Sequence, residues 1–170
     1  MTLIAKETYK WYPVYTNPRA EKKAYEALAR KGIETYLPLN RQLRQWLDRK
    51  KWVEEPLIKS YLFVKIGERQ QTEVLMTNGV CRFIYFSGKI ASMPDRQIDD
   101  LKLLMANSSE LEITAENLAP GEKVRIKAGP LKGLRGEVTD FRSQKQLTVR
   151  LDQLGYSIVI YVAAVLLERL

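Results

Sequence analysis

The chain has 170 residues, and its hydrophobic content of 45% suits packed cores in one ordinary domain or two small ones. No apolar run approaches the roughly 20 residues that a membrane helix needs, and Met1 to Lys10 lacks the apolar centre of a signal peptide, so we expect a cytoplasmic protein with no membrane contact. With no histidine and one cysteine, the sequence offers no ordinary metal site, no serine–histidine triad and no cysteine–histidine pair. We therefore expect neither a cofactor nor enzyme activity.

The net charge of +8 is concentrated in the first part of the chain. Residues 1–106 carry 19 lysines and arginines against 12 acidic residues, whereas residues 107–170 carry 9 against 8. Such an excess indicates a polyanionic partner, most readily nucleic acid, although a moderately basic soluble domain is an equally good interpretation. Cys81 lies in the apolar run Val80–Phe86, which favours a small core residue over a nucleophile.

The first predicted elements are a strand, a helix and a second strand. Lys10–Thr16 is rich in β-forming residues and ends at Asn17 and Pro18, which suit the N-cap and the first position of a helix that runs to Lys31. Gly32 stops this helix, and the next strand covers residues 33–39. One face of the helix is small and apolar, with Ala20, Ala24, Ala27 and Leu28. The opposite face is basic and carries Arg19, Lys22, Lys23, Glu26 and Arg30.

The most charged stretch, residues 41–51, predicts a projecting hairpin with its tip around residues 47–50. Its cations are Arg41, Arg44, Arg49, Lys50 and Lys51, and Trp46 and Trp52 are set among them. Basic residues interleaved with indoles suit nucleic-acid contact, and a loop kept soluble by its charge is the alternative. Further on, we expect a central strand over residues 58–66, a short helix over 68–77, a strand over 80–86 and a helix from Asp95 to Met105.

The last third of the chain predicts a small β-barrel after a linker. Residues 107–119 have no strong period and indicate a linker between a domain of residues 1–106 and one of residues 120–170, with an extended stretch at Leu111–Thr114 as an alternative within it. Alternation predicts strands around 123–127, 137–139, 147–151 and 158–162, which would form four of the strands of a five-strand barrel. Gly133 and Gly136 lie where a side chain would obstruct a tight bend or another backbone. The fold class is thus α+β, with an antiparallel sheet flanked by helices followed by an SH3-like barrel.

Several runs resemble known sequences. Gly121–Lys127, Gly129–Pro130 and Gly136–Val138 resemble the KOW motif, which NusG-type transcription factors and several ribosomal proteins contain, and any SH3-like barrel with a glycine-rich corner is the alternative. In the first domain, Trp11–Tyr12, residues 56–64 and residues 78–83 resemble the N-terminal (NGN) domain of the NusG family. The runs follow each other in the family's order over nearly the whole chain. The short length and the basic hairpin look more like the specialised RfaH and UpxY kind than the general factor.

The resemblance implies a bacterial, monomeric transcription elongation or antitermination factor. Such a factor would bind RNA polymerase through its first domain, suppress pausing or termination, contact upstream or non-template DNA, and recruit a ribosomal protein or termination factor through the KOW barrel. By residue matching, the polymerase-contacting surface would contain Tyr15, Ile58, Tyr61, Phe63, Gln70, Gln71 and Thr72. For the first four, a core position is an equally good interpretation.

The other two predicted surfaces are nucleic-acid-binding and partner-binding. The DNA contact would use Arg19, Lys22, Lys23, Arg30, Arg44, Arg49, Lys50 and Lys51, and the KOW corner would present Leu131 and Leu134. A KOW-containing ribosomal or RNA-binding protein is the alternative function, and the runs between Trp11 and Phe83 argue against it. Residues 129–136 lack the Gly-Lys-Ser/Thr ending that a phosphate-binding P-loop needs, which argues against a nucleotide-hydrolysing enzyme.

Overall fold

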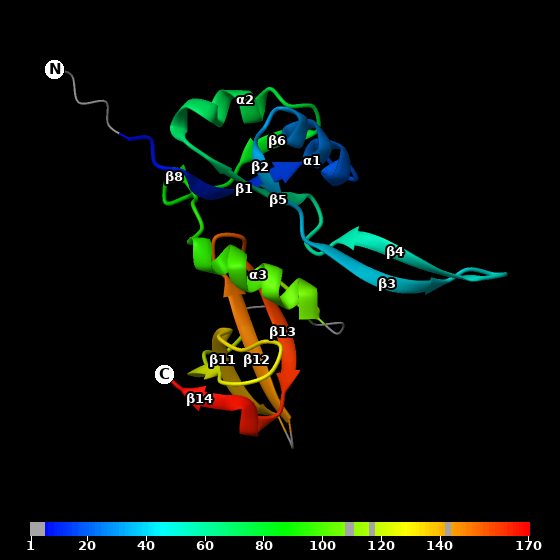
Figure 1. Ribbon diagram of the computed structural model, residues 1–170, viewed down its shortest axis with the longest axis vertical. Coiled ribbons are helices and arrows are strands. Elements are labelled where there is room, and N and C mark those ends of the chain that lie inside the picture. Colours follow the sequence, from blue (N-terminus) through cyan, green and yellow to red (C-terminus); the bar gives the residue numbers. More distant parts are fainter. Residues whose placement is uncertain (1–5, 108–110, 116–117, 142–143) are drawn as a thin grey trace. The chain divides into compact units, whose positions relative to one another are not determined.

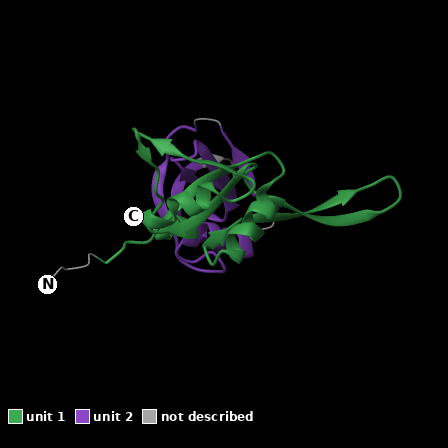
Figure 2. Cartoon of the chain, turned by 90° about the horizontal axis from the view of Figure 1, so that it is seen from above, with its two compact units in different colours: residues 1–98 green, residues 99–170 purple. Residues whose placement is uncertain are grey.

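The computed structural model describes residues 6–107, 111–115, 118–141 and 144–170. The chain forms two compact units, residues 1–98 and 99–170, which Figure 2 shows in different colours. The boundary between them falls within helix α3 (Asp95–Asn107). The segment that the sequence predicts as a linker, 107–119, contains strand β9 (Glu112–Thr114), and its residues 108–110 and 116–117 lie outside the described residues.

Unit 1 is built on a four-stranded antiparallel sheet in the order β2-β5-β1-β6 (Figure 1). Two separate two-stranded ribbons, β3-β4 and β7-β8, accompany it. Its elements before α3 are β1 (Lys10–Thr16), α1 (Glu21–Arg30), β2 (Glu34–Tyr36), β3 (Leu39–Gln45), β4 (Lys50–Pro56), β5 (Tyr61–Ile66), the 3-10 helix η1 (Glu68–Gln70), α2 (Gln71–Leu75), β6 (Val80–Phe83), β7 (Tyr85–Phe86) and β8 (Lys89–Ile90).

The core of unit 1 lies between one face of this sheet and the helices α1 and α2. Successive side chains of a strand point to opposite faces, and Val14 and Leu62, which are register partners on β1 and β5, both point toward the helices. Ala24 and Leu28 of α1 and Val74 of α2 complete the same buried cluster. The apolar stripe predicted for the first helix is therefore its core-facing side, and its basic residues are left at the surface.

Helix α1 begins later than the sequence predicts. Asn17 is not its N-cap, because α1 starts at Glu21 and its N-cap residue, Ala20, makes no side-chain capping bond. The reason is local: Arg19 has a φ of 62°, a left-handed conformation that cannot belong to a right-handed helix. Residues 17–20 form a turn instead, in which the Ala20 amide donates to the Asn17 carbonyl at 3.0 Å. Pro18 and Arg19 of this turn line a cleft.

The predicted hairpin is present and consists of β3 and β4. Its register runs from Leu39 opposite Pro56 to Gln45 opposite Lys50, so the turn lies at residues 46–49. The Trp46 amide donates to the Arg49 carbonyl at 2.7 Å and closes this turn. The hairpin extends away from the remainder of unit 1 in both views (Figures 1 and 2).

Unit 2 contains an antiparallel sheet of six strands in the order β14-β10-β11-β12-β13-β9. The elements after α3 and β9 are β10 (Glu122–Ile126), β11 (Arg135–Phe141), β12 (Gln144–Leu151), β13 (Tyr156–Val162), the 3-10 helix η2 (Ala164–Leu166) and β14 (Leu167–Arg169). Among the described residues, the edge strands β9 and β14 do not pair with each other. The closed five-strand barrel is therefore not confirmed, and the segment expected as linker supplies an additional strand.

The two glycines singled out at the corner of unit 2 are needed for different reasons. Gly133 has a φ of 94°, which favours glycine. A Cβ on Gly136 would lie 2.6 Å from the Thr148 carbonyl oxygen of the neighbouring strand. The predicted obstruction is confirmed at Gly136, which permits the close approach of β12, whereas a Cβ on Gly133 would meet no atom within 4 Å and only the backbone conformation there favours glycine.

Candidate nucleic-acid interface

The basic residues of α1 form an exposed face because the helix is held by its small apolar side. Ala24 and Leu28 are fully buried, which turns Lys22, Lys23 and Arg30 toward solvent. Lys23 and Arg30 are seven residues apart, about two helical turns, so they lie on the same side of the helix. Neither has an ionic partner within the part of the chain that the structure describes. These two charges are available for an external anion.

The hairpin brings a second set of cations to the same side of unit 1. The Lys22 ammonium of α1 donates to the backbone oxygen of Glu54 on β4 at 2.8 Å, which joins the helix to the base of the hairpin. Arg44 on β3 pairs with Glu55 on β4 at 2.6 Å. Lys22 and Arg44 were both predicted to bind nucleic acid, and the structure shows that each already has an internal partner.

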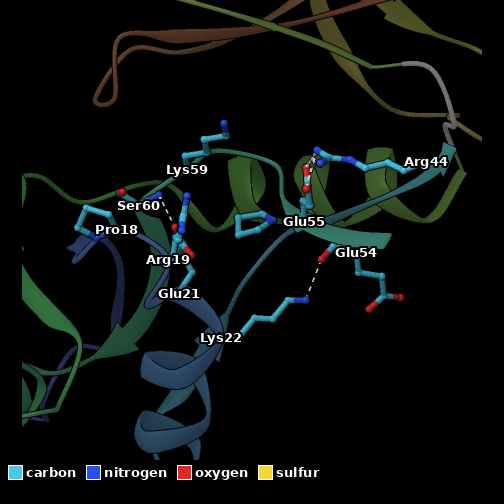
Figure 3. A pocket seen from close by; sticks show the side chains of 10 residues that line it. Pro18, Arg19, Glu21, Lys22, Arg44, Glu54, Glu55, Lys59 and Ser60 are labelled. Carbon is cyan, nitrogen blue, oxygen red and sulfur yellow. Dashed lines mark hydrogen bonds and ion pairs between the residues drawn. The ribbon is translucent and has the colours of Figure 1, made fainter. Parts of the chain in front are cut away.

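A cleft of about 540 Å³ lies between the start of α1 and the base of the hairpin (Figure 3). Two of its lining residues, Arg19 and Ser60, have left-handed backbone conformations, with φ of 62° and 66°. A non-glycine residue in this region is uncommon and is strained by roughly 1 kcal/mol or more. Glu21, which is buried, accepts a hydrogen bond from the Ser60 amide at 3.0 Å and holds the two sides of the cleft together.

The lining of this cleft contains more basic side chains than carboxylates. Its lining contains four basic side chains, Arg19, Lys22, Arg44 and Lys59, and three carboxylates, Glu21, Glu54 and Glu55. Since Glu55 pairs with Arg44 and Glu21 bonds to a backbone amide, the side chains of Arg19 and Lys59 remain without a partner among the described residues. Sequence reasoning missed Lys59, because only the fold brings it beside Arg19.

The remaining predicted nucleic-acid-binding residues lie at the hairpin tip. Arg49, Lys50 and Lys51 are exposed and make no side-chain ion pair within the described residues. Arg41, which was not among the predicted site residues, places its guanidinium 4.8 Å from the centre of the Trp52 ring. The structure thus brings α1 and the hairpin base together around the cleft, and the tip extends the basic surface outward.

The face of the sheet that points away from α1 carries an aromatic pair. Tyr15 and Tyr61 are directly opposite on β1 and β5, with their rings edge to face and their centroids 5.5 Å apart. The Arg82 guanidinium of β6 lies 5.2 Å from the centre of the Tyr15 ring. Both tyrosines are partly exposed, so they are accessible positions of the predicted polymerase-contacting surface.

Ile58 and Phe63, which were predicted on the same surface, are buried and need correction. Phe63 is 0% exposed and Ile58 is 2% exposed, so the core interpretation describes them better. Phe63 stacks on Tyr36 of β2, with ring centroids 6.4 Å apart. Burial raises the pKa of Tyr36 to about 12. Tyr61 and Phe63 lie two positions apart on the same face of β5, yet Tyr61 is partly exposed and Phe63 is buried. The alternation of the sequence does not reveal this difference in exposure.

Gln70, Gln71 and Thr72 lie in helices rather than in the predicted polar loop. Gln70 ends η1, and the other two begin α2. The Gln70 side-chain oxygen accepts a hydrogen bond from the Gly67 amide at 3.3 Å, and only Thr72 of the three is fully exposed. The segment is therefore ordered by its own helical turns.

In unit 2, the two predicted partner-binding leucines differ. Leu134 is fully buried and is a core residue, which corrects its assignment to the surface, whereas Leu131 is half-buried. Cys81 also differs from expectation, because it is exposed rather than buried. It lies on β6, an edge strand whose pairing with β1 is interrupted by a bulge at Tyr15 and Thr16. An edge position exposes side chains that a central strand would bury.

The described residues contain no group of three or more histidine, cysteine, aspartate or glutamate side chains that could hold a metal ion. None of their helices is long and apolar enough to cross a membrane.

The antiparallel sheet with helices on one face, the basic hairpin beside it and the second, all-antiparallel sheet define an α+β protein of two units with a surface suited to a polyanion. Residues 9–102 match the NusG family, described as "Transcription termination factor nusG". The match covers more than half of the chain, so this protein belongs to the NusG family of transcription factors.

The fold is similar to that of a solved NusG structure. A structure of Thermotoga maritima NusG, which concerns its domain interaction, has a TM-score of 0.55 and 19% identity over 96% of this chain and 98% of that chain. The MjSpt4:Spt5 complex in conformation A has a TM-score of 0.33 and 16% identity, over 94% of this chain and 97% of that chain.

Proposed function

We propose that this protein is a transcription elongation or antitermination factor of the specialised RfaH and UpxY kind. It binds RNA polymerase through unit 1, suppresses pausing or termination, and acts in the bacterial cytoplasm as a monomer, by binding rather than by catalysis and without a cofactor. The observation that carries the proposal is the NusG family match over residues 9–102. The exposed basic hairpin supports the specialised kind.

The polymerase contact is made by the exposed part of the sheet face that points away from α1. Tyr15 and Tyr61 supply partly exposed rings that are held in place by each other and by Arg82. Aromatic side chains of this kind bury much area at little conformational cost, which makes them frequent anchors of interfaces. Phe63 supports the face from within the protein, because it is fully buried.

Substitution of Tyr61 tests this contact. We expect Tyr61→Ala to weaken co-purification of polymerase with the tagged full chain at least tenfold, since central aromatic anchors often contribute 2 kcal/mol or more, roughly a thirtyfold change in affinity. Tyr25→Ala is the matched control, because Tyr25 is exposed on α1. Both variants should keep the unfolding midpoint of the parent within a few degrees. Polymerase binding that survives in Tyr61→Ala and in Tyr15→Ala would refute the assignment.

The basic surface of α1 and the hairpin lies along upstream or non-template DNA. Lys23 and Arg30 support this part most directly, because their charges have no partner within the described residues. Arg19, Arg49, Lys50 and Lys51 extend the same surface. Lys22 and Arg44 contribute indirectly, by fixing the hairpin base to α1 and to β4.

The salt dependence of DNA binding tests the basic surface. Each phosphate contact adds about 0.9 to the slope of log K against log salt on duplex DNA, so the double variant Lys23→Gln with Arg30→Gln should reduce this slope by nearly two. Lys89→Gln with Lys132→Gln removes the same total charge from other exposed positions. The control pair should leave the slope nearly unchanged. Equal reductions in both variants would assign the effect to net charge alone.

Unit 2 acts as a KOW domain that recruits a ribosomal protein or a termination factor. The corner at residues 127–134 supports this, because it is a tight, hydrogen-bonded turn in which the Gly133 amide donates to the Ile126 carbonyl at 2.8 Å. Leu131 is the partly exposed apolar residue of that corner, and Leu134 holds it from the core. Leu131→Ser should therefore weaken capture of the purified partner without loss of polymerase binding, and unchanged capture would move the contact elsewhere.

A further inference from the structure

The tip of the β3-β4 hairpin exposes two indole rings. Trp52 is 56% exposed and Trp46 is 55% exposed, whereas Trp11, the third tryptophan of the chain, is 4% exposed. Leu43 and Leu47 on the same hairpin are exposed as well. Large exposed apolar groups gathered on one element are rare in a monomer and mark an interaction site or an aggregation hazard.

The register of the hairpin sets how these side chains lie. Leu43 and Trp52 are directly opposite on β3 and β4, and therefore share a face of the ribbon. Arg41, two residues before Leu43 on the same strand, lies on that face too and places its guanidinium over the Trp52 ring. The contact orients the indole and adds a positive charge beside it. Trp46 begins the turn at the end of the ribbon.

The charges around the two rings distinguish between classes of partner. Arg41, Arg49, Lys50 and Lys51 flank the two indoles in the sequence, and Asp48 is the one acidic residue between positions 41 and 53. An apolar groove of a protein would require these cations to lose water without compensation. A nucleic-acid strand with unpaired bases suits both the indole rings and the cations, because its bases have flat faces for stacking and its phosphates are anionic. The alternation of ring and cation on this hairpin matches that pattern.

We propose that the β3-β4 hairpin binds single-stranded nucleic acid by stacking unpaired bases on Trp46 and Trp52, with Arg49, Lys50 and Lys51 contacting the phosphates. This inference deepens the nucleic-acid part of the proposed function, to which it adds two stacking residues and a requirement for unpaired bases. Stacking on an aromatic side chain tolerates every base, so the hairpin itself binds strands without strong sequence preference.

Tryptophan fluorescence of the full chain, without polymerase, tests this inference directly. We expect 12-residue oligothymidylate or oligouridylate to quench the emission and to protect it from iodide, since two of the three tryptophans stack on bases while Trp11 stays buried. A blunt duplex of the same length should bind through charge alone and leave the emission nearly unchanged. The thymidylate and uridylate arms show whether the hairpin favours DNA or RNA.

Substitutions separate stacking from charge. Trp46→Ala and Trp52→Ala should each weaken single-strand binding roughly tenfold, which corresponds to about 1.4 kcal/mol, and leave duplex binding unchanged. Leu47→Ala is the control, because it removes an apolar group of the same hairpin that is even more exposed and has no ring. Lys50→Gln with Lys51→Gln should weaken both kinds of substrate and lower the salt dependence.

Three results would overturn the inference. The first is a duplex that binds as tightly as the single strand, and the second is tryptophan variants with unchanged single-strand affinity. The third is loss of polymerase association in the tryptophan variants with no change in oligonucleotide binding, which would make the hairpin a protein-contacting element. The proposed polymerase contact is tested separately, because Tyr61→Ala should lose polymerase and keep oligonucleotide binding.

Discussion

The four-stranded sheet and the β3-β4 hairpin belong to the same unit, yet they are stabilised in different ways. In the sheet, Val14, Leu62 and Val64 are fully buried against α1 and α2. In the hairpin, every residue from 41 to 52 is exposed, and the two strands are held by their own ladder, by the Arg44–Glu55 pair and by the Lys22 contact at the base. A two-stranded ribbon alone is marginally stable in water. The side chains on the helix-facing side of the sheet therefore serve stability, whereas those of the hairpin are free to serve contact.

The largest difference is expected when a leucine is shortened in each region. Leu62→Ala should lower the free energy of unfolding by about 3 kcal/mol, because it leaves a cavity in a closed core. Leu43→Ala should change it by about 0.5 kcal/mol, since Leu43 is exposed and loses only its cross-strand contact with Trp52. Urea unfolding of the full chain, followed by circular dichroism, measures both. Similar losses in the two variants would show that the hairpin is part of the cooperative core.

A smaller effect is expected at the junction between the sheet and the hairpin base. Glu21 is buried at the cleft and accepts a hydrogen bond from the Ser60 amide. Glu21→Ala leaves that amide without its acceptor and should destabilise unit 1 by about 1–2 kcal/mol. Glu26→Ala, on the exposed side of the same helix, is the control and should have little effect. Hydrogen exchange of the Ser60 amide would locate the change, and unchanged protection there would mean that the bond contributes little.

The sequence predicts those parts of the fold whose packing follows directly from a local pattern of residues. The alanine and leucine stripe of α1 and a hairpin around residues 41–51 are both found as expected, because periodicity and turn position determine them, although the hairpin strands extend to residues 39 and 56. The start of α1 was predicted wrongly, since Asn17 and Pro18 signal a helix and the left-handed Arg19 delays it. The sequence indicated an extended stretch at Leu111–Thr114 but not its pairing with β13, because a three-residue strand has too little periodicity to show which strand it joins.

The sequence predicted the charges of the candidate site well, and it predicted the exposure of the site residues less well. Residue type identified the basic face of α1 and the hairpin, but it could not show that Lys22 and Arg44 have internal partners. Phe63 and Leu134 look like contact residues in the sequence and are fully buried in the structure. Exposure depends on which elements pack over a strand face, and that information is not local. A family resemblance indicates which residue types occupy which positions, and packing decides which of these residues a partner can contact.

The smallest effect is expected for the ion pair between Arg44 and Glu55, which would show how far the hairpin depends on its own side chains. The two groups are 2.6 Å apart, and their side chains are 51% and 33% exposed, so solvent and salt screen their attraction. A double-mutant cycle with Arg44→Ala and Glu55→Ala should give a coupling of about 0.5 kcal/mol at low salt, and less at high salt. Because the ribbon has few other contacts, this pair should affect hydrogen exchange within β3 and β4 and leave the sheet amides unchanged. A coupling above about 2 kcal/mol, or exchange that changes equally in β1 and β5, would contradict the separation of the two regions.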